Sequence, residues 1–215
     1  MVTRDFFPPF AIQFSGSAFA RWLLRRIGWQ IHFDGLPGLQ GVFAVYPHTS
    51  NWDFVVLVLV KWATGLPARF WAKDKLFRVP VFGRWLRFLG GMPVERNSPQ
   101  GLVGQTVVHF ADCKSRGAYF WLGVAPEGTR KASPGWRSGF YQTTVQAQVP
   151  LCLVKLDYEK REVRIENFIA LKGEPELDFA RIEKIFEGVG AYRPRNAAPV
   201  RLLGTAESRP KKVIS

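Results

Sequence analysis

Residues 41–65 read GVFAVYPHTSNWDFVVLVLVKWATG and contain the change from strand to helix on which our interpretation of the fold rests. The short apolar run that ends at Pro47 predicts a buried strand. Polar residues that suit a helix cap follow it, and a second apolar run begins at Asp53 and ends at Gly65, which predicts a helix over 53–65. A strand that leads directly into a helix is the repeating unit of an α/β sheet.

The rest of the chain repeats this alternation, with no internal repeat and no domain linker. We therefore predict a single α/β domain with a mixed, largely parallel sheet flanked by helices and preceded by an N-terminal amphipathic helix. The expected boundaries are an amphipathic membrane-interface segment at 1–30, the main domain at 31–200 and a basic flexible tail at 201–215. Further strands are expected at 68–73, 92–96, 118–128, 149–158 and 161–171, and further helices at 79–91, 101–117, 138–148 and about 176–188.

The N-terminal segment has large apolar residues at near-helical spacing after the Pro8-Pro9 break, and its arginines fall largely on another face. One interpretation is an interfacial helix that dips aromatic rings into lipid. The other is an amphipathic helix packed on the domain core. The sequence leaves both open. The apolar positions are Phe10, Phe14, Phe19, Trp22, Leu23 and Ile27.

The chain is strongly basic, with 30 Lys and Arg against 17 Asp and Glu and a formal net charge of +13. Such a surface attracts nucleic acid, anionic lipid headgroups or phosphorylated substrates. The 8 Trp and 18 Phe favour a membrane interface. No apolar run reaches the length of roughly 18 residues that a spanning helix needs, and the N-terminus has no signal-peptide pattern. We expect a peripheral protein of the cytoplasmic face of the inner membrane, with an anionic lipid surface as its partner.

Two other classes of site receive less support. Nucleic-acid binding would use the same charge, but the sequence has no RNP-like, zinc-finger or helix-turn-helix signature, so no nucleic-acid partner is expected. The only two cysteines, Cys113 and Cys152, cannot form a disulfide framework. His109 and Cys113 share a helix face, which fits a Cys–His pair or half of a metal site, but without further ligands a simple packed pair is favoured.

His48 and Asp53 lie five residues apart and have two possible roles. On a continuous helix they would be rotated by about 140° from each other, so they can meet only if the chain bends after Pro47. In one interpretation Ser50 and Asp53 form a capping box and His48 is incidental. In the other, Asp53 holds one imidazole nitrogen and the other nitrogen accepts a proton from substrate. A carboxylate has two oxygens, so Asp53 could serve both the cap and His48.

No protein nucleophile accompanies this pair, because the chain has no Gly-x-Ser-x-Gly elbow and neither cysteine is nearby in sequence. A substrate hydroxyl is therefore the group that the histidine would activate. Two other segments place basic residues just after apolar strands, namely GGMPVER at 90–96 and VAPEGTR at 124–130. The planar arginine fork suits a phosphate. Taken singly, each of these arginines is more often a surface residue.

Together these segments resemble the glycerolipid acyltransferase family that includes the 1-acyl-glycerol-3-phosphate acyltransferases. The stretch from His48 to Asp53 resembles its His-x4-Asp motif, and GGMPVER resembles its second motif. APEGTR matches its Glu-Gly-Thr-Arg motif, followed by WRSG at 136–139, and VPLCLV at 149–154 resembles its fourth, apolar motif. The four motifs occur in the family's order over about 40–156, which makes the resemblance specific.

The resemblance implies transfer of an acyl group from acyl-CoA or acyl-carrier protein to the hydroxyl of a lysophospholipid, most closely 1-acyl-glycerol-3-phosphate, with no metal and no cofactor. His48 would be the general base and Asp53 its orienting partner. We also infer that helix amides after His48 stabilise the oxyanion. The residues that would bind the substrate are Arg96, Glu127, Gly128, Thr129 and Arg130, with Lys73, Glu95 and Arg137 in secondary positions.

The sequence departs from the family pattern at Pro93, where an aromatic residue is frequent, and at Leu153, where a second proline is usual. These departures leave the chemistry intact but put the acceptor in doubt. An acyltransferase that acts on another lysolipid or polar lipid is therefore one alternative. A non-catalytic lipid- or nucleic-acid-binding protein is the alternative from another class.

Overall fold

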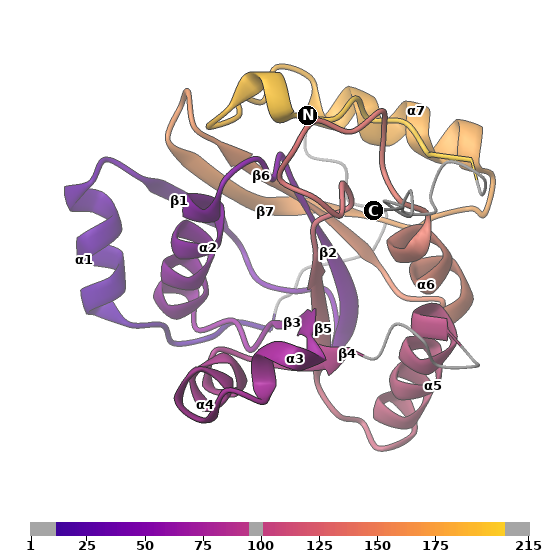
Figure 1. Ribbon diagram of the computed structural model, residues 1–215, viewed down its shortest axis with the longest axis horizontal. Helices are drawn as coiled ribbons and strands as arrows, with labels where there is room; N and C mark the ends of the chain where they lie inside the picture. The colour runs from indigo at the N-terminus through magenta and orange to yellow at the C-terminus, as the bar shows by residue number, and fades with distance from the viewer. Residues whose placement is uncertain (1–11, 95–100, 205–215) are drawn as a thin grey trace, which may run out of the picture.

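The computed structural model describes residues 12–94 and 101–204, which fold around one seven-stranded sheet (Figure 1). The strands run in the order β1-β7-β6-β2-β5-β3-β4. All neighbouring pairs are parallel except β6 and β7, which are antiparallel. This confirms the predicted α/β class with a mixed, largely parallel sheet. The strands are β1 Gln30–Phe33, β2 Gln40–Tyr46, β3 Arg69–Lys73, β4 Gly91–Val94, β5 Phe120–Val124, β6 Leu151–Asp157 and β7 Glu162–Ile169.

Helices cover both faces of the sheet, with α1 and α2 on one side and α5 and α6 on the other (Figure 1). Most follow the predicted ranges closely. The strand β1 and the short helix α3 were not predicted, because each is only four residues long and carries little periodic signal. The helices are α1 Ala18–Arg26, α2 Asn51–Thr64, α3 Asp74–Phe77, α4 Pro80–Phe88, α5 Gly101–Ser115, α6 Gly139–Ala147 and α7 Pro175–Phe186, with a 3-10 turn at Pro194–Asn196.

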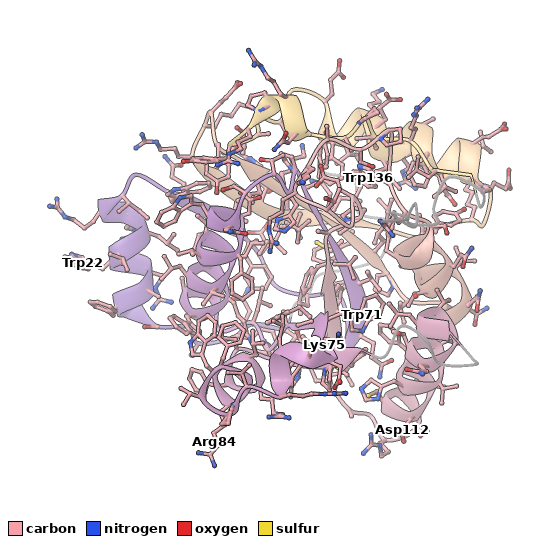
Figure 2. The ribbon with its side chains drawn as sticks, in the orientation of Figure 1. Trp22, Trp71, Lys75, Arg84, Asp112 and Trp136 are labelled. Carbon is pink, nitrogen blue, oxygen red and sulfur yellow. The ribbon has the colours of Figure 1, made fainter. Side chains whose placement is uncertain are left out.

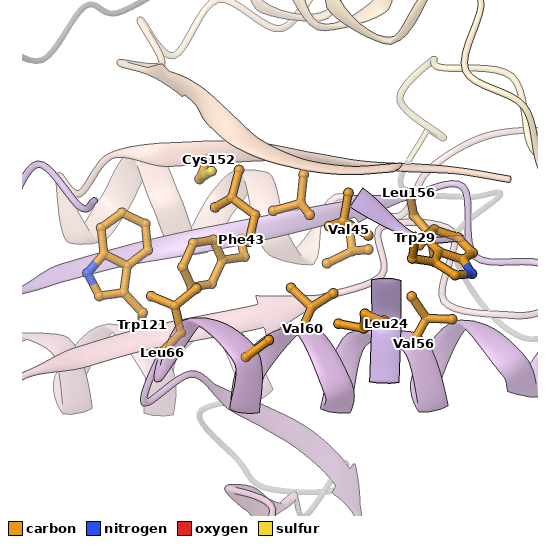
Figure 3. Close-up of a cluster of buried hydrophobic side chains, with 14 of the residues drawn as sticks. Leu24, Trp29, Phe43, Val45, Val56, Val60, Leu66, Trp121, Cys152 and Leu156 are labelled. Atoms are coloured by element: carbon orange, nitrogen blue, oxygen red, sulfur yellow. The ribbon is translucent and has the colours of Figure 1, made fainter. Parts of the chain in front are cut away.

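The central strand β2 supplies side chains to two apolar clusters, one on each face of the sheet. Successive strand residues point to opposite faces, so Phe43 and Val45 pack toward α2 while Val42 and Ala44 pack toward α5 and α6. Figure 3 shows the first cluster, in which Val45 lies over Val60 of α2 and Phe43 lies beside Trp121 and above Leu66. Burial on both faces explains why this strand is apolar at every position from Val42 to Val45 and not at alternate ones.

The N-terminal segment is helical over a shorter range than predicted. Helix α1 begins only after Ser17, whose hydroxyl accepts a hydrogen bond from the Ala20 amide. Its buried face, formed by Ala20 and Leu24, packs against α2, while Phe19 and Trp22 are exposed. Earlier in the segment, Phe14 contacts the ring of Tyr119 instead of continuing a helix. Phe10 lies outside the described residues.

The parallel strands bring several chain segments to one edge of the sheet. Strands β5 and β6 both run parallel to β2, and β3 runs parallel to β5, so the carboxyl ends of all four strands lie at this edge. The segments that begin at Pro47, Ala125 and Tyr158 follow β2, β5 and β6 directly. In open α/β sheets this edge is where ligands bind. Within 12–94 and 101–204, no helix has the length and apolarity needed to cross a bilayer.

Candidate active site

The loop after β2 brings His48 and Asp53 together. Pro47 follows a cis peptide bond and ends the strand, and α2 begins at Asn51 with Ser50 as its N-cap. The bend between them places Nδ1 of His48 3.1 Å from Oδ2 of Asp53. The Asp53 side chain is fully buried, whereas that of His48 is 14% exposed. With Nδ1 turned toward the carboxylate, Nε2 is the imidazole nitrogen available to a substrate.

The capping box predicted at the start of α2 is also present. The amides of Thr49 and Ser50 each donate to Oδ2 of Asp53 at 2.7 Å, and the hydroxyl of Ser50 accepts from the Trp52 amide at 3.2 Å. The cap and the His48 contact therefore coexist. The sequence suggested that each would use a different oxygen of Asp53, but both use Oδ2. The cap fixes the carboxylate against which the imidazole is oriented.

Asp53 is ionised at neutral pH. Burial alone would raise the pKa of its carboxyl, but interactions with the His48 imidazole, the Ser50 amide and the Tyr158 hydroxyl outweigh burial and lower the pKa below its usual value. A buried anion of this kind is suited to stabilise an imidazolium at Nδ1 once Nε2 takes a proton.

Glu127 holds the same loop from the other side. Its side chain is 1% exposed, and its oxygens accept hydrogen bonds from the amide of His48 at 2.6 Å and from the amide of Ala198 at 3.1 Å. Burial, together with the nearby charge of Asp53, raises the pKa of the Glu127 carboxyl to about 7 even though the two amide bonds oppose the shift. Both carboxyl oxygens serve backbone groups inside the protein. We therefore assign Glu127 to positioning His48.

The remaining residues of the EGTR turn lie closer to solvent. The amide of Gly128 donates to the carbonyl of Ala125, and Gly128 has φ +66, which glycine adopts without strain. A Cβ at this position would come within 2.5 Å of the Arg137 side chain, so Arg137 lies directly against the turn. Arg130 is exposed, and Thr129 accepts a hydrogen bond from the Lys131 amide. Arg137 therefore packs against the turn, and Arg130, which belongs to the turn, lies on its exposed side.

Three further predicted positions are Glu95, Arg96 and Lys73. Glu95 and Arg96 lie outside the described residues. Lys73 is the last residue of β3, whose carboxyl end is at the same edge of the sheet as that of β5. The backbone thus brings the segment after β3 to the edge that holds the His48 loop.

Tyr158, which sequence reasoning did not single out, also contacts this site. It directly follows β6, a strand parallel to β2. Its place at the end of the strand predicted over 149–158 was the only signal in the sequence. Its buried hydroxyl approaches the Asp53 carboxylate without reaching full hydrogen-bond geometry. Burial and this carboxylate both raise the pKa of Tyr158. The ring lines a cavity of about 580 Å³ together with Trp29, Arg161 and Tyr192.

Residues 190–203, here named the C-terminal strap, join the loops of the site. The amide of Arg193 donates to Oγ1 of Thr49 at 3.1 Å, and the side-chain amide of Asn196 donates to the carbonyl of Arg130 at 3.0 Å. The Ala198 amide reaches Glu127 at 3.1 Å. The strap therefore connects the His48 loop to the EGTR turn. Leu203 is buried at its end, and residues 205–215 lie outside the described range.

The backbone amides around His48 are already engaged. Those of His48, Thr49, Ser50 and Trp52 all donate to side chains within the protein. These four groups are therefore not available to an oxyanion. The sequence had suggested that amides after His48 would stabilise the oxyanion.

His109, Asp112 and Cys113 form a separate cluster on α5, with their potential ligand atoms within 4.8 Å of one another. The ring of His109 packs on Phe120, the first residue of β5, whereas Glu127 lies three residues beyond the last residue of that strand. Asp112 is paired with Arg116. The cluster lies at the far end of β5 from the candidate active site and takes no part in it.

Two comparisons with known proteins bear on the family and the fold of the chain. A sequence model of the family described as Acyltransferase matches residues 30–155, more than half of the chain. The crystal structure of the 1-acyl-sn-glycerophosphate (LPA) acyltransferase PlsC from Thermotoga maritima has a similar fold, with a TM-score of 0.50 and 16% sequence identity over 79% of this chain and 74% of that one. No curated protein matches the chain. The family match includes His48, Asp53, Glu127 and Arg130, while Tyr158 lies just beyond it.

Proposed function

The chain belongs to the acyltransferase family, and from that premise we propose that it transfers a fatty acyl group from an acyl thioester to the hydroxyl of a lysophospholipid. The proposed acceptor is 1-acyl-glycerol-3-phosphate, and the proposed donor is acyl-CoA or acyl-carrier protein. The observation that carries the proposal is the 3.1 Å approach of His48 Nδ1 to the buried Asp53 carboxylate, which leaves Nε2 for a substrate.

The substrate itself supplies the nucleophile in this proposal. Both cysteines are buried, and burial raises the pKa of the Cys152 thiol well above its usual value. The hydroxyls nearest His48 in sequence, on Thr49 and Ser50, accept hydrogen bonds from the amides of Arg193 and Trp52. A neutral imidazole with a free Nε2 is well suited to activate an alcohol brought in by the acceptor.

The proposed reaction proceeds in one addition and one elimination. Nε2 of His48 takes the proton of the acceptor hydroxyl as the oxygen forms a C–O bond to the thioester carbonyl carbon. Asp53 stabilises the imidazolium that results. The C–S bond then breaks, and the leaving thiolate takes the proton from His48, which completes the ester. The one proton therefore moves from the acceptor hydroxyl through His48 to the thiol, and the proposed scheme uses neither a metal nor a cofactor.

The arginines beside the EGTR turn are the proposed phosphate site. Arg130 belongs to the turn whose Glu127 holds the His48 loop, and Arg137 packs against that turn. A phosphate bound there would bring a hydroxyl of the same small molecule toward Nε2. Gly128 leaves room for the Arg137 side chain against the turn. Arg96, Glu95, Thr129 and Lys73 keep their proposed roles near this phosphate.

We place the protein on the cytoplasmic face of the inner membrane as a peripheral protein. The net charge of +13 supports attraction to an anionic leaflet, where a lysophospholipid acceptor would reside. An acyltransferase with another lysolipid or polar-lipid acceptor is the alternative that the departures at Pro93 and Leu153 support.

The test is an assay of the purified chain with a panel of lysolipids, each combined with acyl-CoA or acyl-carrier protein. We expect the highest kcat/KM with a phosphomonoester acceptor. Asp53→Asn keeps a cap acceptor but removes the charge, and it should lower the rate by about 10²-fold or more. An Asp53→Asn rate near that of the unmodified chain would reduce Asp53 to a helix cap. No transfer to any lipid in the panel would refute the proposed function.

A further inference from the structure

Helix α4, Pro80–Phe88, carries large apolar side chains on the side that faces away from the protein. Val81 is 81% exposed, Phe88 is 75% exposed and Trp85 is 44% exposed. Residues at this spacing lie on one stripe of a helix. Gly83 and Leu86, on the opposite side, are buried. Both sides of the helix are therefore apolar, and an exposed cluster of this kind indicates an interaction surface.

The exposed stripe is held firmly in place. A Cβ at Gly83 would come within 2.3 Å of the Phe77 carbonyl oxygen, so α4 lies in close contact with α3. The ammonium group of Lys61 on α2 donates a hydrogen bond to the carbonyl of Leu89, the residue that ends α4. The apolar side chains are thus presented by a helix that is fixed to the domain at both its middle and its end.

Basic residues border the stripe. The sequence of α4, PVFGRWLRF, contains two arginines and no acidic residue. Arg84 projects away from the protein in Figure 2, and the guanidinium of Arg87 lies 5.3 Å from the centre of the Phe77 ring. Exposed aromatic and aliphatic side chains flanked by arginine match the apolar interior and anionic headgroups of a bilayer surface.

An aromatic row connects the stripe to the candidate active site. Phe54 follows Asp53 directly in the chain, and its ring centre lies 6.4 Å from that of Trp85 and 5.4 Å from that of Phe70. Phe82 continues the row, 5.5 Å from Trp85. The exposed surface of α4 is therefore continuous with the first turn of α2, where Asp53 orients His48.

We propose that the outer face of α4, formed by Val81, Trp85 and Phe88 and bordered by Arg84, is the surface that docks the protein on an anionic lipid bilayer. The row from Trp85 to Phe54 extends this apolar surface from the docked face toward the first turn of α2, which contains Asp53. The purpose of the docking rests on the proposed lipid chemistry, but vesicle binding is measured without turnover.

The test is sedimentation of the full chain with vesicles of phosphatidylcholine, with and without phosphatidylglycerol. We expect binding to the anionic vesicles that weakens with salt. The double variant Val81→Ser/Phe88→Ser should weaken it by about tenfold or more, because each side chain loses apolar burial in the lipid. The matched control is Val108→Ser/Leu177→Ser, which removes two side chains that are 62% and 60% exposed on α5 and α7, and it should bind as the unmodified chain does.

A second measurement does not depend on how the serine variant folds. Cys113 and Cys152 are buried, so a polarity-sensitive dye can be attached selectively at Val81→Cys or, as the control, at Val108→Cys. Anionic vesicles should shift the emission of the dye at residue 81 to shorter wavelength and leave the dye at residue 108 unchanged. Equal shifts, or no shift at either residue, would overturn the docking assignment.

Other outcomes would assign the vesicle-binding surface to α1, or the exposed face of α4 to a second copy of the chain. If Phe19→Ser/Trp22→Ser abolishes vesicle binding while Val81→Ser/Phe88→Ser retains it, α1 is the docking helix and the proposal fails. If Val81→Ser/Phe88→Ser converts a dimer to a monomer without changing vesicle binding, a second copy covers the stripe and the proposal also fails. If binding depends on Val81 and Phe88 but no lysolipid is acylated, the docking surface stands and only the proposed function is lost.

Discussion

Replacing Glu127 with glutamine distinguishes a positioning role from a substrate-binding role. Glutamine has nearly the same shape but only one acceptor oxygen, so it satisfies one of the two amides that Glu127 now serves, those of His48 and Ala198. The other amide is left buried against an NH2 group, which costs about 1–3 kcal/mol of stability. The same change releases the His48 loop, so kcat should fall by about tenfold or more while the KM for the acceptor stays nearly constant.

The stability cost of Glu127→Gln should also depend on pH. Folding raises the pKa of Glu127 from 4.5 to about 7, so the folded protein binds this proton more tightly than the unfolded chain does. The stabilisation from this proton is present at low pH and is lost as pH rises through about 7, which amounts to about 2–3 kcal/mol between pH 5 and pH 8. Glutamine does not titrate. The difference in free energy of unfolding between the unmodified chain and Glu127→Gln should therefore be largest near pH 5 and shrink by that amount toward pH 8.

The assay is urea unfolding of both proteins at pH 5, 6, 7 and 8, together with steady-state kinetics. Glu183→Gln is the control, because it makes the same change of charge at an exposed position on α7 and should leave stability nearly constant across this range. A difference in free energy of unfolding that does not change with pH would refute the raised pKa of the buried Glu127 carboxyl. A raised KM with an intact kcat would instead make Glu127 a substrate-binding residue.

Three further substitutions test residues around His48 and Asp53 and in the EGTR turn. Tyr158→Phe should lower kcat severalfold, because the Tyr158 hydroxyl helps to lower the pKa of Asp53. Stability should change little, because this hydroxyl does not reach full hydrogen-bond geometry; kinetics that match the unmodified chain would remove Tyr158 from the site. Arg130→Gln should raise the KM for a phosphorylated acceptor by about tenfold while KM for the thioester stays constant, and equal effects on both substrates would contradict the phosphate assignment. Gly128→Ala should lower the free energy of unfolding by about 1–3 kcal/mol, measured by urea unfolding, because φ is +66 and the Arg137 side chain occupies the space of a Cβ; an unchanged midpoint would show that the turn relaxes freely.

The parts of the site that lie close together in sequence were predictable. His48 and Asp53 are five residues apart, and the bend at Pro47 followed by good cap residues is a local signal. The alternation of apolar runs likewise predicted the sheet class, because each strand and helix records its own burial pattern.

The parts that depend on distant segments were not predictable. Glu127 stands in a polar turn and was expected to face the substrate, but the Ala198 amide, 71 residues further along the chain, covers it. Tyr158 comes close to Asp53 only because β6 lies parallel to β2 at the register that pairs Val45 with Val154. Strand order and register are set by packing of the whole sheet, and no single segment carries that information.

The central claim is that His48, oriented by Asp53, is the base that activates an acceptor hydroxyl. The most direct measurement is the rate of acyl transfer to lysophosphatidate by His48→Ala, on protein whose urea unfolding midpoint matches that of the unmodified chain. We predict a loss of about 10³-fold or more in kcat, because general-base catalysis and the hydrogen bond that holds the hydroxyl disappear together. A His48→Ala rate within tenfold of the unmodified rate would contradict the claim.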